Sequence, residues 1–280
     1  DIVYDESLFK PAEEFFEQEV PSSTSTGPRR FEPLKKVEKV AAADPVKAEA
    51  YLVGDITTGK IYIEKNSTKV YPFASMSKLV TALVAEDTYK ATDELTITEA
   101  NTQVPKDAST LTAGEILTVK ELLYPMLLNS SNVAAEVIAS STDRGKFLEL
   151  MSSYSWEIGM SQAYFADPTG LSSNNMGTAR GFFAMAQYLY SKRPEILAIT
   201  RTPQLSIATT SAHNAHVFTN IHPFVKDPRF LGGKTGHTDA ALDTMLTIMN
   251  INNHPTAFIV LRSPYNREAD TKTLINQVSS

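Results

Sequence analysis

The sequence predicts an α+β fold: an antiparallel sheet formed by both ends of the chain and flanked by helices, with a helical subdomain inserted between the two halves. Paired strand patterns occur near each end of residues 46–280, and helical periodicity fills much of residues 76–200 between them. Because strand pairs at both ends must bury a face, the economical arrangement joins them in one sheet.

The strand pairs are recognised by apolar and β-branched runs on either side of a turn. Residues 48–55 and 60–64 flank a Thr-Thr-Gly turn and form the first pair. Residues 244–251 and 256–261 flank an Asn-Asn-His-Pro turn and form the second. Residues 268–278 then have the pattern of a final helix.

Three helices are predicted in the middle of the chain. The first begins around Ser75, shortly after Pro72, and carries apolar residues at helical spacing. The second covers the leucine-rich residues 116–129, and the third begins at Val133 after a short polar loop.

The N-terminal part has a different composition from the rest. The net charge of −6 comes from residues 1–20, so the remaining chain is balanced and has no basic excess for nucleic acid. Residues 11–20 fit either a short acidic helix or a flexible spacer, and residues 21–28 resemble a linker. We therefore expect an acidic N-terminal segment and linker over residues 1–45 and a globular domain over residues 46–280.

The composition of the chain excludes several kinds of protein and several kinds of site. Without cysteine the chain has no disulfides, thiolate zinc sites or cysteine nucleophiles. The longest apolar runs are too short to span a membrane. The chain begins at Asp1 rather than at methionine, so the sequence allows for membrane anchoring through a segment absent from this chain.

Three histidines close together in the sequence, His213, His216 and His222, raise the alternative of a zinc site. Neither an HExxH pattern nor a carboxylate partner accompanies them in the sequence, so ordinary loop histidines are favoured. We expect no metal and no cofactor.

Three short motifs follow one another in the order and rough spacing of acyl transfer through serine: Ser75-Met-Ser-Lys78, Ser130-Ser-Asn132 and Lys234-Thr-Gly236. Each alone is a weak signal, but their conjunction is specific. Ser75 lies at the predicted helix start, and Lys78 lies one turn later on the same face, where a neutral amine could take the hydroxyl proton. Burial and a second cation, Lys234, could keep that amine neutral.

The second motif lies in the polar loop between two predicted helices, from which side chains can point into a cleft. Ser130 could carry a proton to a departing amine, and Asn132 could hydrogen-bond a substrate carbonyl. The alternative is that Ser130 and Ser131 are only helix caps.

The third motif places Lys234 on or beside a strand that edges the cleft. Gly232, Gly233 and Gly236 would let a substrate peptide approach closely as an added strand. A phosphate-binding loop is the competing interpretation of Gly-Lys-Thr, but the earlier glycine that it requires is absent and a strand pattern follows.

Together with the segments Phe165-Ala-Asp-Pro-Thr-Gly-Leu171 and Lys234-Thr-Gly-His-Thr-Asp-Ala-Ala241, the motifs resemble the serine D-Ala-D-Ala carboxypeptidases, the low-molecular-mass penicillin-binding proteins. The resemblance covers residues 46–280 and implies a β-lactamase/transpeptidase-like fold. It also implies peptidoglycan stem peptides as substrate, β-lactam antibiotics as covalent inhibitors, and an extracytoplasmic location, periplasmic or at the cell surface.

The resemblance further implies a role for each motif residue. Ser75 would be the acylated nucleophile, Lys78 the general base and Ser130 the proton relay. Asn132 would contact the substrate amide.

The third motif would supply the remaining contacts. Lys234 and Thr235, on the strand that contains Gly236, would bind the terminal carboxylate. The backbone N–H groups of Ser75 and His237 would form the oxyanion hole.

Val133, Gly181 and the pair Leu242-Asp243 depart from the usual family pattern, and none of these changes removes a catalytic group. Two alternatives remain open. A class A-like β-lactamase would need a deacylating glutamate with a downstream asparagine, and the best candidate, Glu157, lacks that asparagine. A non-catalytic penicillin sensor or wall-binding protein would acylate and turn over poorly.

Overall fold

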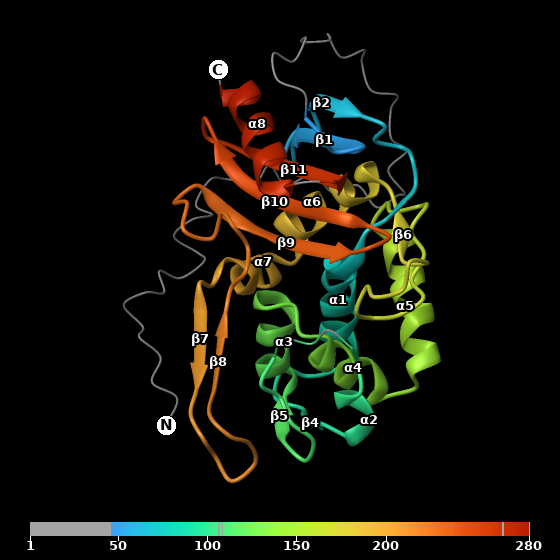
Figure 1. Cartoon of the computed structure of the whole chain (residues 1–280), viewed down its shortest axis with the longest axis vertical. Coiled ribbons are helices and arrows are strands. Elements are labelled where there is room, and N and C mark those ends of the chain that lie inside the picture. The colour runs from blue at the N-terminus through green and yellow to red at the C-terminus, as the bar shows by residue number, and fades with distance from the viewer. Residues whose placement is uncertain (1–45, 106, 108, 265, 280) are drawn as a thin grey trace, which may run out of the picture. The chain divides into compact units, whose positions relative to one another are not determined.

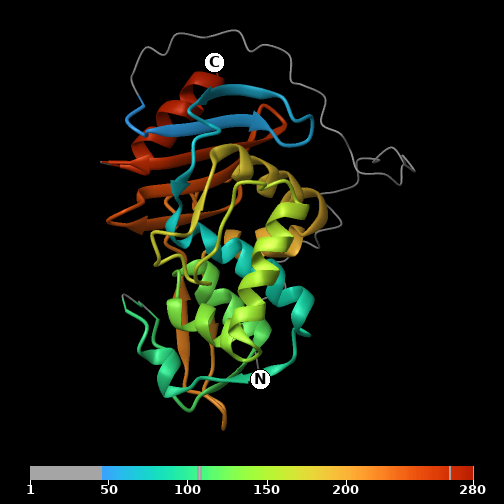
Figure 2. The ribbon, with the colours of Figure 1, turned by 90° about the vertical axis from the view of Figure 1, so that its right-hand side faces the viewer.

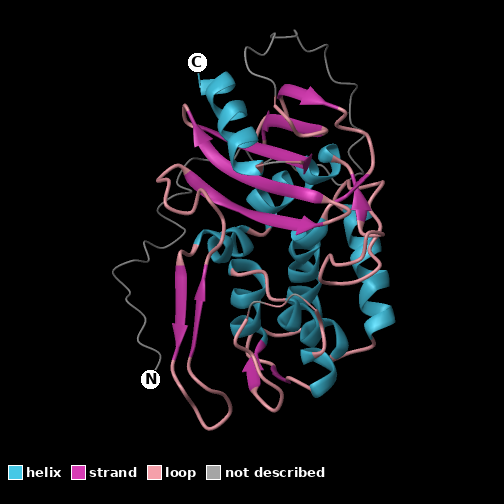
Figure 3. Cartoon of the chain, viewed as in Figure 1, coloured by secondary structure: helices cyan, strands magenta, loops and turns pink. Residues whose placement is uncertain are grey.

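The structure is a computed structural model that describes residues 46–105, 107, 109–264 and 266–279 (Figure 1). The predicted acidic helix and linker lie outside the described residues. Figure 3 shows a sheet at one end of the described part and a group of helices at the other. The α+β class predicted from the sequence is confirmed.

The main sheet has five strands in the order β2-β1-β11-β10-β9, and each neighbouring pair is antiparallel. The first strand lies beside the last one, from Ala50 opposite Leu261 to Asp55 opposite Thr256. The two chain ends therefore share one sheet, as predicted. Its strands are β1 (Ala50–Asp55), β2 (Ile61–Lys65), β9 (Phe230–Thr238), β10 (Leu242–Ile251) and β11 (His254–Ser263).

Helices cover both faces of this sheet because β11 alternates its apolar side chains between them. Phe258 and Val260 belong to the apolar cluster under α8, which also contains Leu274. Ile259 belongs to the larger cluster, which includes α6 residues and extends into the inserted helices. In Figure 2 these helices lie below the sheet.

The helices follow the predicted order along the chain. They are α1 (Lys78–Thr88), α2 (Glu99–Thr102), α3 (Val119–Leu128), α4 (Asn132–Ser140), α5 (Arg144–Glu157), α6 (Ala179–Lys192), α7 (Pro194–Arg201) and α8 (Arg267–Ser279). Short strands form separate pairs: β3 (Tyr71–Pro72) with β6 (Met176–Gly177), β4 (Glu94–Thr96) with β5 (Ile116–Thr118), and β7 (Gln204–Ile207) with β8 (His216–Thr219).

The start of the second predicted helix was wrong. Residues 116–118 form strand β5, and the helix begins only at Val119. Thr118 and Glu121 form a capping box, in which each side chain accepts a hydrogen bond from the other residue's backbone N–H. This cap fixes the helix start and leaves the preceding β-branched residues to pair with β4.

Contrary to the expectation from the sequence, His213 and His216 do have carboxylate neighbours. His216 Nε2 lies 3.0 Å from Glu115 Oε1, and His213 Nε2 lies 3.9 Å from Glu121 Oε1. Glu115 also accepts hydrogen bonds from the backbone N–H groups of Thr112 and Asn214. These carboxylates join the β7–β8 hairpin to β5 and α3, and no grouping suited to a metal ion is found among the described residues.

Within the same described ranges, no helix is both long and apolar enough to span a bilayer.

Candidate active site

Ser75 lies in a 3-10 turn, Ala74–Ser77, that leads directly into α1. The predicted helix start is therefore correct to within one turn. Ala74, just before Ser75, has a left-handed backbone with φ of 51°. Such a conformation is costly for a residue with a side chain and is typical of functional sites. A Cβ on Gly170 would lie 2.0 Å from the carbonyl oxygen of Ala74, so only glycine allows this approach.

Lys78 lies within hydrogen-bond distance of Ser75, as its spacing predicts. Its Nζ is 3.0 Å from Ser75 Oγ, 2.7 Å from Asn132 Oδ1 and 2.6 Å from the carbonyl oxygen of Thr169. The first two motifs are thus joined through one amine. The Lys78 side chain is completely buried.

Burial lowers the pKa of Lys78 to about 7, although the carboxylates of Asp167, Asp107 and Glu136 oppose this shift. Burial likewise lowers the pKa of Lys234 well below its usual value, and the charge of Lys78 adds to that effect. Of the two causes that the sequence suggested, burial is the one that lowers the pKa of Lys78.

The second and third motifs meet at Ser130. Lys234 Nζ donates to Ser130 Oγ at 2.9 Å and to the carbonyl oxygen of Thr235 at 2.9 Å. Ser130 lies between α3 and α4 with a φ of 65°. Of the two serines, Ser131 is a helix cap, whose hydroxyl accepts from Ala134 N at the start of α4, whereas Ser130 contacts Lys234.

The third motif lies on β9, the last strand in the sheet order. Thr235 is buried and His237 is exposed, with its Nδ1 3.0 Å from Asp243 Oδ1. The described contacts thus form two groups, Ser75 and Asn132 around Lys78 and Ser130 beside Lys234, and the charge of Lys78 acts on Lys234.

Gly236 and Gly233 lie against the protein's own backbone, and the approach of a substrate strand to these glycines stays a prediction. A Cβ on Gly236 would lie 2.9 Å from the backbone nitrogen of Ser75 and 2.9 Å from the carbonyl oxygen of Phe73. A Cβ on Gly233 would meet the carbonyl oxygen of Leu246 at 2.3 Å. The glycines therefore allow β9 to approach the protein's own backbone, and Gly236 brings the strand against the Ser75 N–H.

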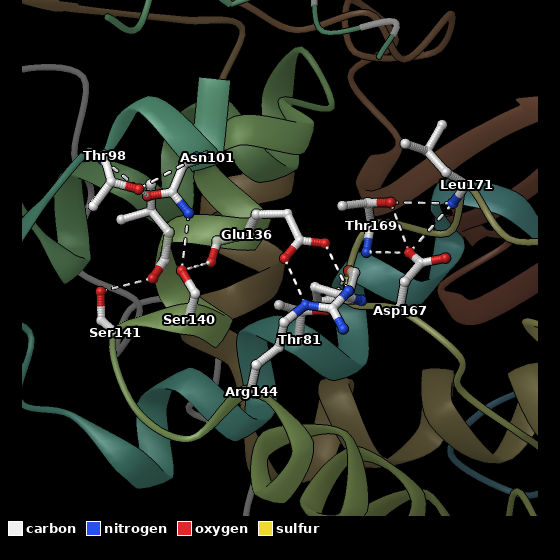
Figure 4. Close-up of polar contacts among 12 residues, drawn as sticks. Thr81, Thr98, Asn101, Glu136, Ser140, Ser141, Arg144, Asp167, Thr169 and Leu171 are labelled. Atoms are coloured by element: carbon white, nitrogen blue, oxygen red, sulfur yellow. Dashed lines mark hydrogen bonds and ion pairs between the residues drawn. The ribbon is translucent and has the colours of Figure 1, made fainter. Parts of the chain in front are cut away.

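Three charged residues near the site were not singled out from the sequence. Asp167 accepts hydrogen bonds from the N–H groups of Thr169, Gly170, Leu171 and Ser172, which shapes the loop whose Thr169 carbonyl meets Lys78 (Figure 4). Burial by itself would raise the pKa of Asp167, but these bonds and that of the Thr169 hydroxyl outweigh it and lower the pKa.

Arg267 and Asp107 complete this set. Arg267 Nη1 donates to the carbonyl oxygen of Gly236 at 2.8 Å and to Asp243 Oδ1 at 2.9 Å, so the start of α8 supports β9. Asp107 accepts from the backbone N–H groups of Asn132 and Val133 at the start of α4. Neither residue lies near a motif in the sequence, which leaves no local signal by which to find it.

Comparison with known proteins agrees with this geometry. The profile of the D-alanyl-D-alanine carboxypeptidase family matches residues 37–264. A D-alanyl-D-alanine endopeptidase of Pseudomonas aeruginosa is 28% identical over 249 residues, which cover 82% of this chain and 79% of that protein. A D-alanyl-D-alanine endopeptidase of Escherichia coli is 28% identical over 250 residues, covering 86% of this chain and 80% of that protein.

Solved structures share the fold. A penicillin-binding protein homologue from Mycobacterium tuberculosis superposes with a TM-score of 0.79 at 20% identity, covering 87% of this chain and 95% of that one. Penicillin-binding protein D2 of Listeria monocytogenes, solved with cefotaxime bound, gives a TM-score of 0.72 at 25% identity, covering 84% and 98% of the two chains.

The fold and the serine–lysine site define a serine hydrolase of the penicillin-binding type. The chain belongs to the D-alanyl-D-alanine carboxypeptidase family, whose members act on the cell wall through an acylated serine.

Proposed function

We propose that Ser75 is the nucleophile with which this chain, as a serine D-Ala-D-Ala carboxypeptidase, cleaves peptidoglycan stem peptides. The observation that carries this assignment is the buried amine of Lys78, 3.0 Å from Ser75 Oγ and with a pKa lowered to about 7. At this distance a neutral amine can accept the hydroxyl proton as Ser75 attacks the carbonyl carbon of the penultimate D-Ala.

The attack produces an oxyanion, which the N–H groups of Ser75 and His237 stabilise. Ser130 gives its hydroxyl proton to the nitrogen of the departing D-Ala, the C–N bond breaks, and an ester is left on Ser75. Ser130 is reprotonated from Lys234 beside it, which in turn takes the proton that Lys78 received from Ser75. Water then attacks the ester and gives a proton to Lys78, the ester C–O bond breaks, and Ser75 takes that proton to restore its hydroxyl.

Binding of the peptide follows from the edge position of β9. The stem peptide lies alongside this strand, and Asn132 contacts its amide. Lys234 and Thr235, which precede Gly236 on this strand, hold the terminal carboxylate. A free carboxylate is thereby distinguished from an amide.

Labelling with a penicillin tests the nucleophile. The intact protein is incubated with the labelled antibiotic, and mass spectrometry locates the adduct. The wild-type protein should carry one penicillin on Ser75, and Ser75→Ala should carry none. Ser77→Ala, two residues further along the same turn, should keep the adduct. An adduct on the Ser75→Ala variant would overturn the assignment.

Cleavage of cross-links between stem peptides is a second candidate activity. The observation that favours it is that relatives from Pseudomonas aeruginosa, Escherichia coli and Haemophilus influenzae are named D-alanyl-D-alanine endopeptidases. The same acyl-enzyme would form, with a larger leaving group. Rates on a cross-linked peptide dimer and on the matching monomer ending in D-Ala-D-Ala distinguish the two activities.

The same proposal extends to the cellular location of the protein and to its domain organisation. A wall substrate requires an extracytoplasmic enzyme, periplasmic or at the cell surface, with β-lactams as covalent inhibitors. Residues 46–280 form the catalytic domain, and residues 1–45 serve as its N-terminal segment and linker.

A further inference from the structure

The carboxylate of Asp107 is surrounded by hydrogen-bond donors from the start of α4. Its Oδ1 accepts from the hydroxyl of Ser131 at 3.0 Å, from the backbone N–H of Val133 at 3.0 Å and from the backbone N–H of Asn132. Its Oδ2 accepts from the N–H and the hydroxyl of Ser109. Both carboxylate oxygens are thus used within the protein.

We propose that Asp107 is a positioning residue of the acylation reaction: it fixes the backbone of the second motif so that the Asn132 amide meets the Lys78 amine. This inference rests on the proposed function, because it takes Lys78 as the base that activates Ser75.

The segment that contains Asp107 binds both the backbone and the side chain of Asn132. Its backbone N–H is bound by the carboxylate, and its Nδ2 donates to the carbonyl oxygen of Pro105 at 3.1 Å. The amide oxygen is then left to face Lys78, whose Nζ lies 2.7 Å away. A displacement of this segment would move the amide oxygen, and Lys78 would lose a contact that directs it toward Ser75.

The first turn of α4 needs an acceptor from outside the helix. The first backbone N–H groups of any helix have no partner within it. Ser131 serves the N–H of Ala134, whereas the N–H groups of Asn132 and Val133 are served by Asp107. A negative charge at a helix N-terminus is also favourable. Asp107 therefore combines a geometric effect with an electrostatic one.

The electrostatic effect reaches Lys78. The charged groups around this amine are Asp107 from the loop before β5, Glu136 from α4, Asp167 from the loop before β6 and Lys234 from β9. The three acids favour the protonated amine, and burial opposes it. Removing the charge of Asp107 should therefore lower the pKa of Lys78, which a merely structural cap would not do.

The test is the second-order rate of acylation by a labelled penicillin, measured against pH in the full chain. Asp107→Asn should lower the high-pH plateau by about 10- to 100-fold, the range expected when a reacting group is displaced by up to about 1 Å. The midpoint of the profile should also move to lower pH. Asp107→Glu, which keeps the charge, should lower the plateau and leave the midpoint in place.

Asp143→Asn is the matched control, because Asp143 caps α5 by accepting from the N–H of Lys146 at 3.0 Å. This variant keeps a capping oxygen and loses only the charge at the helix start, so it should keep both the plateau and the midpoint. If Asp107→Asn behaves like Asp143→Asn, Asp107 is only a cap and the inference is wrong.

Should Asp107→Asn fail to fold, Ser131→Ala removes one donor to the same carboxylate and keeps the charge. Its plateau should fall with an unchanged midpoint, and a plateau equal to that of the wild type would also overturn the inference. Absence of any acylation in the wild-type protein would instead refute the proposed function itself.

Discussion

Burial of a single side chain, Lys78, can prepare the base that we propose. A lysine in water is protonated at neutral pH, but burial lowers the pKa of this amine to about 7. Only the neutral amine can take the Ser75 proton. The rate of acylation by a penicillin should therefore rise with pH and level off above about 7. The measurement is the rate of adduct formation across this range.

Substituting the base separates its charge from its chemistry. Lys78→Arg keeps a positive charge that does not titrate in this range, so acylation should fall by at least about 10²-fold and lose its rise with pH. Lys192→Arg, an exposed change on α6, is the control. A wild-type profile in Lys78→Arg would show that another group removes the proton.

Lys234 should determine the preference for a free C-terminus. A charge-assisted hydrogen bond contributes about 1.5 to 3 kcal/mol, so its loss should lower acylation efficiency by roughly 10- to 150-fold. The rates on a peptide ending in D-Ala-D-Ala and on its C-terminal amide are measured for the wild type and Lys234→Ala. Because Lys234 also affects Lys78, the ratio of the two rates is the relevant quantity. An undiminished ratio in the variant would place carboxylate recognition elsewhere.

The residues of the candidate site could be found from the sequence only where they lie within a short motif. Ser75 and Lys78 are one helical turn apart, so their contact follows from local geometry. Asp107 and Arg267 act across large sequence separations, and their partners depend on how loops and helices pack. Gly236 was recognised, but the backbone that approaches it, at Ser75, is visible only in three dimensions.

At the scale of elements, the sequence contains a signal for the start of α3 that the apolar pattern alone does not give. Thr118 and Glu121 have the capping-box spacing, which marks the start of α3 and would have separated β5 from the helix. The β7–β8 hairpin is harder to predict. Its strands are short and half polar, and the loop between them is held by Glu115 from another part of the chain.

Glu115 should make this hairpin sensitive to acid. Although burial alone would raise the pKa of Glu115, hydrogen bonds from Thr112 and Asn214 and the contact with His216 lower it to about 2. An unfolded glutamate titrates near about 4.3. The stabilisation is therefore complete above about pH 4.3 and is lost as the pH falls toward about 2.

Glu115→Gln tests this contribution. The variant should be less stable at neutral pH by about 1 to 3 kcal/mol, the usual effect of disrupting buried hydrogen bonds to a charged group. Its stability should also fall less between about pH 5 and about pH 2 than that of the wild type. Urea denaturation at several pH values measures both effects, with the exposed Glu149→Gln as control. Equal pH dependence in Glu115→Gln and the wild type would contradict the prediction.

At the scale of the whole described unit, the arrangement of the sheet could be predicted because its cause is general. Two strand pairs with apolar faces must bury them, and one shared sheet with helical cover accomplishes this. The mutual packing of the helices could not be predicted in the same way. It brings Asp87 of α1, Tyr154 of α5 and Tyr188 of α6 around Arg193, where α6 ends and α7 begins.

Beside this cluster, Glu86 should make stability and activity respond to pH in opposite directions. One carboxylate oxygen of Glu86 is buried without a hydrogen-bond partner. Burial, with the nearby Glu195, raises its pKa to about 7, although Arg193 opposes the shift. The folded state thus binds a proton that the unfolded chain releases near about pH 4.3. This stabilisation is complete below that pH and is lost as the pH rises through about 7.

Glu86→Gln replaces the titrating group with a neutral one of similar shape. The free energy of unfolding of this variant minus that of the wild type should increase between about pH 5 and about pH 8, because only the wild type loses stability through Glu86. Taking the difference removes the contribution of Lys78, which both proteins share. Glu157→Gln, an exposed change at the end of α5, should show no such trend. If the difference for Glu86→Gln is also constant with pH, Glu86 does not take up a proton on folding. If the difference changes as expected, the rise in pH that makes Lys78 neutral also destabilises the folded protein through Glu86.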